Sequence, residues 1–232
     1  MGFDIHFDLF GANILSSQPE KTRTFSLSGQ PETEFETVML PRHEEISKAK
    51  STYRQSYYSD SSAPLSMHCG WSSDEAQILA YEAFLSLFDR GGDVLDLGCG
   101  NGALLRFLLS RLSVKISPYG VDFLEESIQE AKTVVLSDFS DNFFASSIDD
   151  FNPGVQKFSC IITSPDYTFD PDFRKHVKKC FSWLEPRGKL MLYDYKGSEY
   201  FKDFVKSWCD LDLGFMEIIE TNLTAIVCYV KD

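Results

Sequence analysis

Apolar residues after residue 72 alternate between two periodicities, one typical of helices and one typical of short buried strands. Ser72 followed by Glu75 is typical of a capping box, so a helix is predicted to begin there and to end near residues 89–92. Residues 94–97 then predict a buried strand, and the leucines of residues 104–112 predict another helix. The expected core face of the first helix consists of Ala76, Leu79, Ala83, Phe84 and Leu87.

The same alternation continues to the C-terminus and predicts a mainly parallel sheet with helices on both faces. Residues 119–123 predict a strand that ends in Asp122, followed by a helix over about residues 124–132. Only two residues separate the last two strands, so these should pair as a hairpin and one of them should run antiparallel. The other predicted strands are residues 142–145, 158–163, 189–195, 216–221 and 224–230, and the other predicted helices are residues 172–183 and 199–211.

The N-terminal part of the chain has a different pattern. Residues 1–71 are expected to form an extension or lid, and residues 72–232 a single α/β domain. Within the extension, FSLSG and ETEFETVML are candidate hairpin strands, and SYYSDSSAP at residues 56–64 is rich in turn-forming residues and is typical of a linker.

Composition narrows the classes of partner. Hydrophobic residues make up 43% of the 232 residues, and the formal charge is −13. The basic residues cluster only modestly, at residues 174–179, so a nucleic-acid partner is not expected. The six cysteines show no C-x-x-C spacing, so we expect a reduced, cytoplasmic protein without a metal site. No run of 18 apolar residues occurs, and no membrane association is expected.

The segment VLDLGCGNG at residues 94–102 places three glycines between a strand and a helix. Such a turn presents backbone N–H groups at the carboxyl edge of the sheet, where open α/β sheets bind ligands. Asp122 ends the next strand 24 residues after Gly98, a distance at which a carboxylate can accept both hydroxyls of a ribose. The spacing from Gly98 also fits a dinucleotide fingerprint, so a nicotinamide enzyme is one alternative. Asp96, however, is badly placed for a pyrophosphate and well placed for the ammonium of an amino-acid tail.

The glycine segment, VDF at residues 121–123 and the late antiparallel hairpin together resemble the class I S-adenosylmethionine-dependent methyltransferases, over residues 72–230. The resemblance implies a Rossmann-like, doubly wound, mostly parallel seven-stranded sheet with an antiparallel C-terminal hairpin strand. It also implies S-adenosyl-L-methionine as the cofactor.

Cofactor contacts follow from the same resemblance, position by position. Asp96 would support the methionine part, Asp122 would bind the ribose hydroxyls, and Phe123 would pack on the adenine. In the stretch that contacts the adenine, serine stands where the family commonly has aspartate. The residues implied to contact the cofactor are Asp96, Gly98, Cys99, Gly100, Asp122, Phe123, Ser147, Ile148 and Ser164.

Candidates for the methyl-acceptor site follow the strand at residues 158–163. The sequence Ser164-Pro165-Asp166-Tyr167 is similar to the [Asp/Asn/Ser]-Pro-Pro-[aromatic] motif of amino-methyltransferases, with Asp166 in place of the second proline. The same four residues are also typical of an ordinary turn. Asp194, near the end of a later strand, is a further candidate. The predicted catalytic residues are therefore Asp166, Tyr167 and Asp194.

Three functions are compatible with these residues. The leading hypothesis is an enzyme that methylates an oxygen or nitrogen of a small molecule. A protein or peptide side chain is the alternative acceptor, since an acidic surface can attract a basic partner. A domain that binds the cofactor without catalysis and serves as a partner subunit is the alternative from another class.

Overall fold

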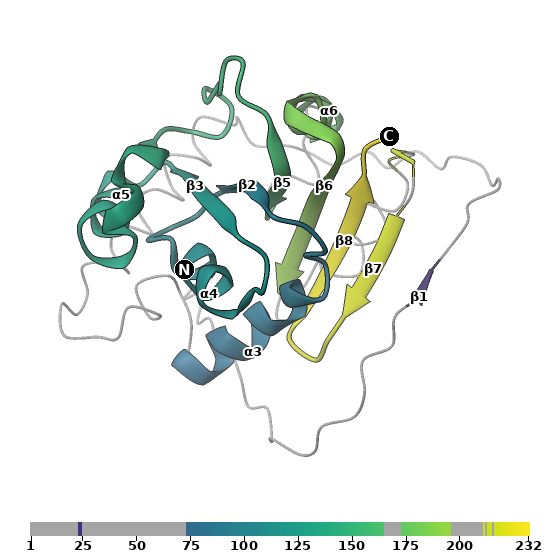
Figure 1. The fold of residues 1–232 in the computed structure, drawn as a ribbon, viewed down its shortest axis with the longest axis horizontal. Coiled ribbons are helices and arrows are strands. Elements are labelled where there is room, and N and C mark those ends of the chain that lie inside the picture. The colour runs from purple at the N-terminus through teal and green to yellow at the C-terminus, as the bar shows by residue number, and fades with distance from the viewer. Residues whose placement is uncertain (1–22, 25–72, 165–172, 196–210, 212, 215) are drawn as a thin grey trace, which may run out of the picture.

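The computed structural model describes residues 23–24, 73–164, 173–195, 211, 213–214 and 216–232. In this part of the chain the core is one mixed sheet, with strands in the order β1-β7-β8-β6-β5-β2-β3-β4 (Figure 1). The strands are β1 (Arg23–Thr24), β2 (Gly92–Leu97), β3 (Ile116–Asp122), β4 (Phe143–Ala145), β5 (Phe158–Thr163), β6 (Leu184–Tyr195), β7 (Met216–Glu220) and β8 (Thr224–Val230).

Strand directions agree with the predicted sheet. The neighbours β4, β3, β2, β5 and β6 run parallel to one another. Strand β8 lies between β6 and β7 and is antiparallel to both, which confirms the predicted C-terminal hairpin with a single reversed strand. The two-residue β1 pairs antiparallel with β7 and adds an eighth strand at that edge. Chain order reverses between β2 and β5, the kind of position where open α/β sheets bind ligands.

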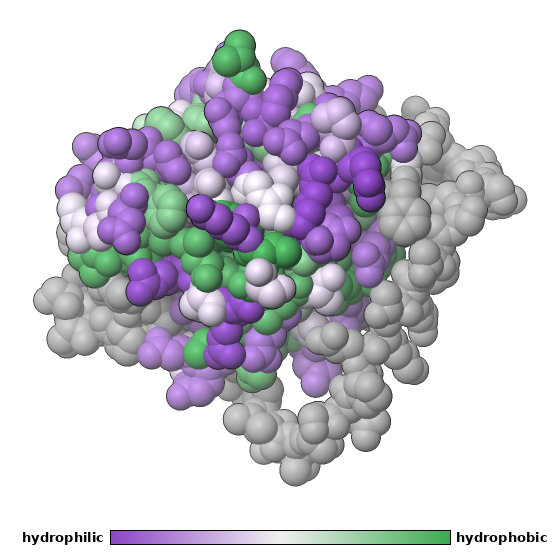
Figure 2. All heavy atoms as spheres, in the orientation of Figure 1, coloured by the Kyte–Doolittle hydropathy of each residue, from purple (hydrophilic) through white to green (hydrophobic). Residues whose placement is uncertain are grey.

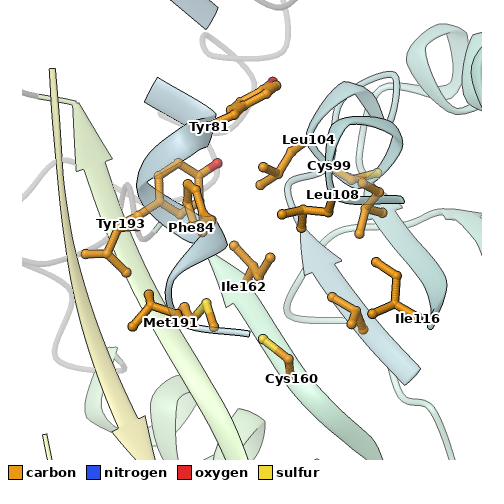
Figure 3. Packing of buried hydrophobic residues seen from close by; sticks show 14 of the residues in the cluster. Tyr81, Phe84, Cys99, Leu104, Leu108, Ile116, Cys160, Ile162, Met191 and Tyr193 are labelled. Atoms are coloured by element: carbon orange, nitrogen blue, oxygen red, sulfur yellow. The ribbon is translucent and has the colours of Figure 1, made fainter. Parts of the chain in front are cut away.

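Helices cover both faces of the sheet. They are α3 (Asp74–Leu85), α4 (Ala103–Arg111), α5 (Glu125–Glu130) and α6 (Phe173–Trp183), together with the π-helix η1 (Ala131–Val135) and the 3-10 helix η2 (Ser137–Asn142). Buried residues of α3, α4, α5 and η1 pack on one face, while those of α6 pack on the other. Figure 3 shows the first face, where Phe84 and Leu108 meet Ile162 and Met191 of the sheet. The domain is therefore a three-layer α/β/α sandwich.

The start and end of α3 differ from the prediction. Its N-cap is Ser73, whose side chain accepts a hydrogen bond from the Ala76 N–H at 3.2 Å, and not Ser72. The helix ends at Leu85, before the predicted residues 89–92, because the N–H of Ser86 turns to the carbonyl of Phe84. Leu87 nevertheless stays fully buried, in the turn that follows the helix.

The buried face of α3 also differs. Ala80 and Tyr81 are buried along with the predicted Ala83 and Phe84, whereas Leu79 is 53% exposed. Helical spacing placed Leu79 on the core stripe, but packing against α4 and the sheet rotates the helix toward the Tyr81 side. There Tyr81 contacts Phe107 of α4, with a ring-centroid distance of 5.7 Å.

Other predicted elements have new bounds or lie outside the described residues. Strand β6 begins at Leu184, five residues before the predicted strand. The helix predicted at residues 124–132 becomes α5 followed by η1. The helix predicted at residues 199–211 falls outside the described residues except for Leu211, and the two candidate N-terminal strands fall wholly outside them. The described pair Arg23–Thr24, which forms β1, directly precedes the first of these candidate strands.

One face of the described residues is largely polar. Figure 2 shows hydrophilic residues over most of the face it presents, with apolar residues gathered in a band across the middle. In the described ranges, no helix is both long and apolar enough to cross a bilayer.

Candidate functional site

The turn between β2 and α4 has an unusual backbone. Gly98, Gly100 and Gly102 have φ angles of 88°, 53° and 81°, a region that residues with a Cβ rarely adopt. The N–H groups of Gly98 and Cys99 both donate to the carbonyl of Val121, at 2.7 and 3.0 Å. The turn is thereby fixed to the carboxyl end of β3.

Two of these glycines have opposite surroundings. A Cβ built on Gly98 would have no heavy atom within 4 Å, so open space lies beside the first half of the turn. A Cβ on Gly102 would lie 2.9 Å from Cδ1 of Leu136 and 3.7 Å from Cβ of Ala131. The second half of the turn is therefore packed closely against η1 and the residue that follows it.

Asp122 lies at the end of β3 and is 9% exposed. One carboxylate oxygen accepts the Gly100 N–H at 2.9 Å, and the other accepts the Leu124 N–H at 2.8 Å. Burial raises the pKa of Asp122, while backbone hydrogen bonds from Leu124, Gly100 and Phe123 oppose that rise. The two oxygens have about four lone-pair sites between them, so the carboxylate can accept a further donor beside these three backbone donors while it holds the turn.

Asp96, on the central strand β2, is 2% exposed. Across the described portion of the chain, its Oδ1 atom has no hydrogen-bond donor. Burial, and secondarily the nearby charge of Asp122, raise the pKa of Asp96 to about 8. A buried carboxyl oxygen without a donor is uncommon in a folded protein, and it marks this position as one that can receive a ligand cation.

The remaining predicted cofactor residues lie around the same edge of the sheet. Cys99 is buried, and a Cβ on Gly120 would lie 2.7 Å from its sulfur. The hydroxyl of Ser147 donates to Asp150 at 2.6 Å and accepts the Asp150 N–H at 3.1 Å, so it stabilises the turn after β4. The implied cofactor residues that are half-buried are Gly100, Phe123, Ser147, Ile148 and Ser164.

Only part of the predicted acceptor site falls in the described residues. Asp166 and Tyr167 lie outside them. Asp194 is half-buried near the end of β6, where its backbone carbonyl accepts the Thr224 hydroxyl at 2.7 Å. In the described ranges, no group of three or more His, Cys, Asp or Glu residues is arranged to hold a metal ion.

Two polar residues of this region were not identified from the sequence. Asn101 is fully buried, and its side-chain oxygen accepts the Ala103 N–H at 3.3 Å, at the start of α4. Its side-chain nitrogen donates to a carboxylate oxygen of Glu130 at 3.1 Å. An asparagine just before a helix is a signal for capping, but nothing in the sequence indicates its pairing with a residue 29 positions later.

The match of residues 94–188 to the methyltransferase domain family covers the glycine turn, β3 and β5. This match and the strand order decide the family. Residues 94–188 carry a domain of the class I S-adenosylmethionine-dependent methyltransferases. A curated relative, the ubiquinone biosynthesis O-methyltransferase of Coxiella burnetii, is 28% identical over an alignment of 123 residues that covers 48% of this chain and 51% of the relative. The chain thus spans about half the length of the curated relatives it matches.

Solved methyltransferases share the fold. The plantazolicin methyltransferase BpumL, solved with a triazolic substrate analogue and S-adenosylhomocysteine, superposes with a TM-score of 0.54 at 14% identity, covering 82% of this chain and 99% of that one. A methyltransferase from Pyrococcus furiosus superposes with a TM-score of 0.52 at 16% identity, covering 81% and 98%. At such low identity these similarities show the fold alone.

Proposed function

We propose that this methyltransferase transfers a methyl group to an oxygen or nitrogen of a small molecule. S-adenosylmethionine, the cofactor of the family, supplies an electrophilic methyl group on a sulfonium. The observation that carries the proposal is the pairing of two features at one strand end. Asp96 is buried with an oxygen that lacks a donor among the described residues, and Gly98 has open space beside it. Both features fit a cofactor with an amino-acid tail.

The assignment of the binding residues follows from their chemistry. Asp96 would accept the ammonium of the methionine part, which compensates the cost of a buried carboxylate. Asp122 would bind the ribose hydroxyls through the acceptor capacity that its three backbone donors leave available. Phe123 and Ile148 would enclose the adenine, with Ser147 at its polar edge, while Cys99 and Gly100 line the approach.

We assign the binding and deprotonation of the methyl acceptor to the residues that follow β5 and to the end of β6. Methyl transfer is a direct displacement, so holding the acceptor in line can lower the barrier by on the order of 7 kcal/mol. Ser164 and Tyr167 would orient the acceptor, and either Asp166 or Asp194 would take its proton. We further propose that residues 72–232 form the catalytic domain and that residues 1–71 cover the acceptor.

A basic peptide is the second candidate acceptor. The observation in its favour is the formal charge of −13, which would attract a cationic partner over long range. The curated relative, an O-methyltransferase of ubiquinone biosynthesis by name, favours a small hydroxyl acceptor instead.

The test begins with calorimetric titration of the full chain with S-adenosylhomocysteine and with NADH. We expect binding of the former alone, weakened tenfold or more by Asp122→Ala, about 1.4 kcal/mol. Asp141→Asn, an exposed change in charge on η2, is the control. Methyl-labelled cofactor is then offered with catechols, small amines and a lysine-rich peptide. Transfer only to the peptide would replace the proposed acceptor class. Binding without transfer to any acceptor would indicate a catalytically silent domain, and NADH binding would refute the assignment of Asp96.

A further inference from the structure

The glycine turn is held from two sides by carboxylates on different elements. Asp122, at the end of β3, accepts the N–H of Gly100. Glu130, at the end of α5, accepts the side-chain N–H of the neighbouring Asn101. The first of these carboxylates belongs to the proposed cofactor site, whereas the second has no role in it.

The oxygen and the nitrogen of the Asn101 side-chain amide both make hydrogen bonds here. It is 0% exposed, its oxygen caps the N–H of Ala103, and its nitrogen meets Glu130. The backbone N-cap of α4 is Gly102, which has no side chain to cap the helix, so Asn101 supplies the missing acceptor. A buried amide used in this way can change partner only at a high cost in free energy.

Close packing also holds the glycine turn against the end of α5. The absent Cβ of Gly102 allows the turn to approach Leu136 and Ala131, and Ala131 directly follows Glu130 in the chain. Helix α5 changes to π-helical hydrogen bonding at this junction. The second half of the turn is therefore docked on the end of α5 by one hydrogen bond to a carboxylate and by close contact of backbone with side chains.

We propose that Asn101 and Glu130 form a positioning pair that fixes the glycine turn for the cofactor. The proposal rests on the proposed function, because it assigns the pair to that same site. If Asp122 also accepts the ribose hydroxyls, its hydrogen bond to Gly100 is shared with the ligand. A second anchor that the ligand does not touch then keeps the turn in place and preserves the open space beside Gly98.

An exchange of the two functional groups tests this pair. Asn101→Asp keeps the acceptor for Ala103 but sets a carboxylate against Glu130, whereas Glu130→Gln offers an amide in its place. The double variant restores one donor and one acceptor with their positions exchanged. Glu130→Ala, on a partly exposed helix end, removes the acceptor with less risk of unfolding. Gln129→Ala, an exposed neighbour on α5, is the matched control.

Two readouts are needed, hydrogen exchange at the amides of residues 100–103 and affinity for S-adenosylhomocysteine. We expect Asn101→Asp and Glu130→Ala each to speed exchange at the turn and to weaken binding by about tenfold, the factor for losing a hydrogen bond to a charged group. The double variant should recover both quantities to within about threefold of the wild type.

The outcomes separate this proposal from the proposed function. Wild-type exchange and affinity in Asn101→Asp and Glu130→Ala would overturn the positioning pair, and so would a double variant no better than Asn101→Asp. If the wild type does not bind S-adenosylhomocysteine, the proposed function fails. In that case, unchanged hydrogen exchange in Asn101→Asp and Glu130→Ala would refute the anchor as well. If exchange is faster in these single variants and recovers in the double variant, the pair holds the turn but has no role in binding.

Discussion

Cofactor binding should depend on pH through Asp96, and the dependence should disappear in Asp96→Asn. Burial and the charge of Asp122 raise the pKa of this carboxyl to about 8, so at neutral pH the free protein holds it largely protonated. An ammonium can pair only with the ionised form. Binding below pH 8 must therefore release the Asp96 proton, and affinity must fall as the solution becomes more acidic.

The size of the effect follows from the ionisation of Asp96. The α-amino group of S-adenosylhomocysteine lies beside a free carboxylate, which keeps it protonated between pH 6 and pH 8. With Asp96 half ionised at pH 8, its ionised fraction falls about 50-fold by pH 6, which is about 2.3 kcal/mol. Asp96→Asn binds more weakly at pH 8, and it has lost the group that titrates, so its affinity should stay nearly constant over the same interval.

Titration calorimetry at pH 6, 7 and 8 measures this directly. Repeating the pH 7 titration in two buffers with different ionisation enthalpies counts the released protons, which should approach one for the wild type and zero for Asp96→Asn. Asp141→Asn should behave as the wild type. Parallel pH profiles for the wild type and Asp96→Asn would refute the reasoning, because the proton would then come from another group.

Three further results are expected. The folded pKa of Asp96 lies above its ordinary value of 3.8, so the free energy of unfolding should fall as pH rises from about 4 to 8, by up to about 1.4 kcal/mol per unit. Urea titrations should show a flatter pH dependence for Asp96→Asn, and an equal slope would contradict the assignment. Gly98→Ala should cost about 1 kcal/mol of backbone strain and weaken S-adenosylhomocysteine binding, since its Cβ enters open space. Gly102→Ala should destabilise by about 2 to 4 kcal/mol, since it adds a clash with Leu136. A smaller loss of stability in Gly102→Ala than in Gly98→Ala, measured by thermal unfolding, would contradict the difference in packing. Asp122→Asn should weaken binding and speed exchange of the Gly100 amide, and unchanged exchange would argue against its role in holding the turn.

Buried strands were the elements best predicted from the sequence. The predicted strands at residues 158–163 and 224–230 match β5 and β8 residue for residue. β5 is buried along its length and β8 is buried up to its last residue, so a short, mainly apolar run marks the extent of each strand. The glycine turn was predicted equally well from the sequence, because its positive φ angles favour residues without a Cβ.

Helix limits and helix rotation were predicted less well. Ser72 and Ser73 are both suitable caps by composition, and only the backbone conformation selects Ser73. Leu79 fits the apolar period of α3 but is exposed, since contacts with α4 decide which side of the helix faces the core. Local patterns contain no information about such contacts between distant segments.

The sequence by itself determined the order of strands and helices along the chain, the glycine turn, and the two aspartates near the ends of β2 and β3. These features depend on local periodicity and on residue type. The tertiary structure alone decided that Asp96 is buried with an oxygen lacking a donor in the described region, that Gly98 faces open space while Gly102 is packed, and that Asn101 meets Glu130. Each of these properties depends on what other segments bring to within a few ångströms of a side chain. The folded chain sets these distances, and no spacing along the sequence encodes them.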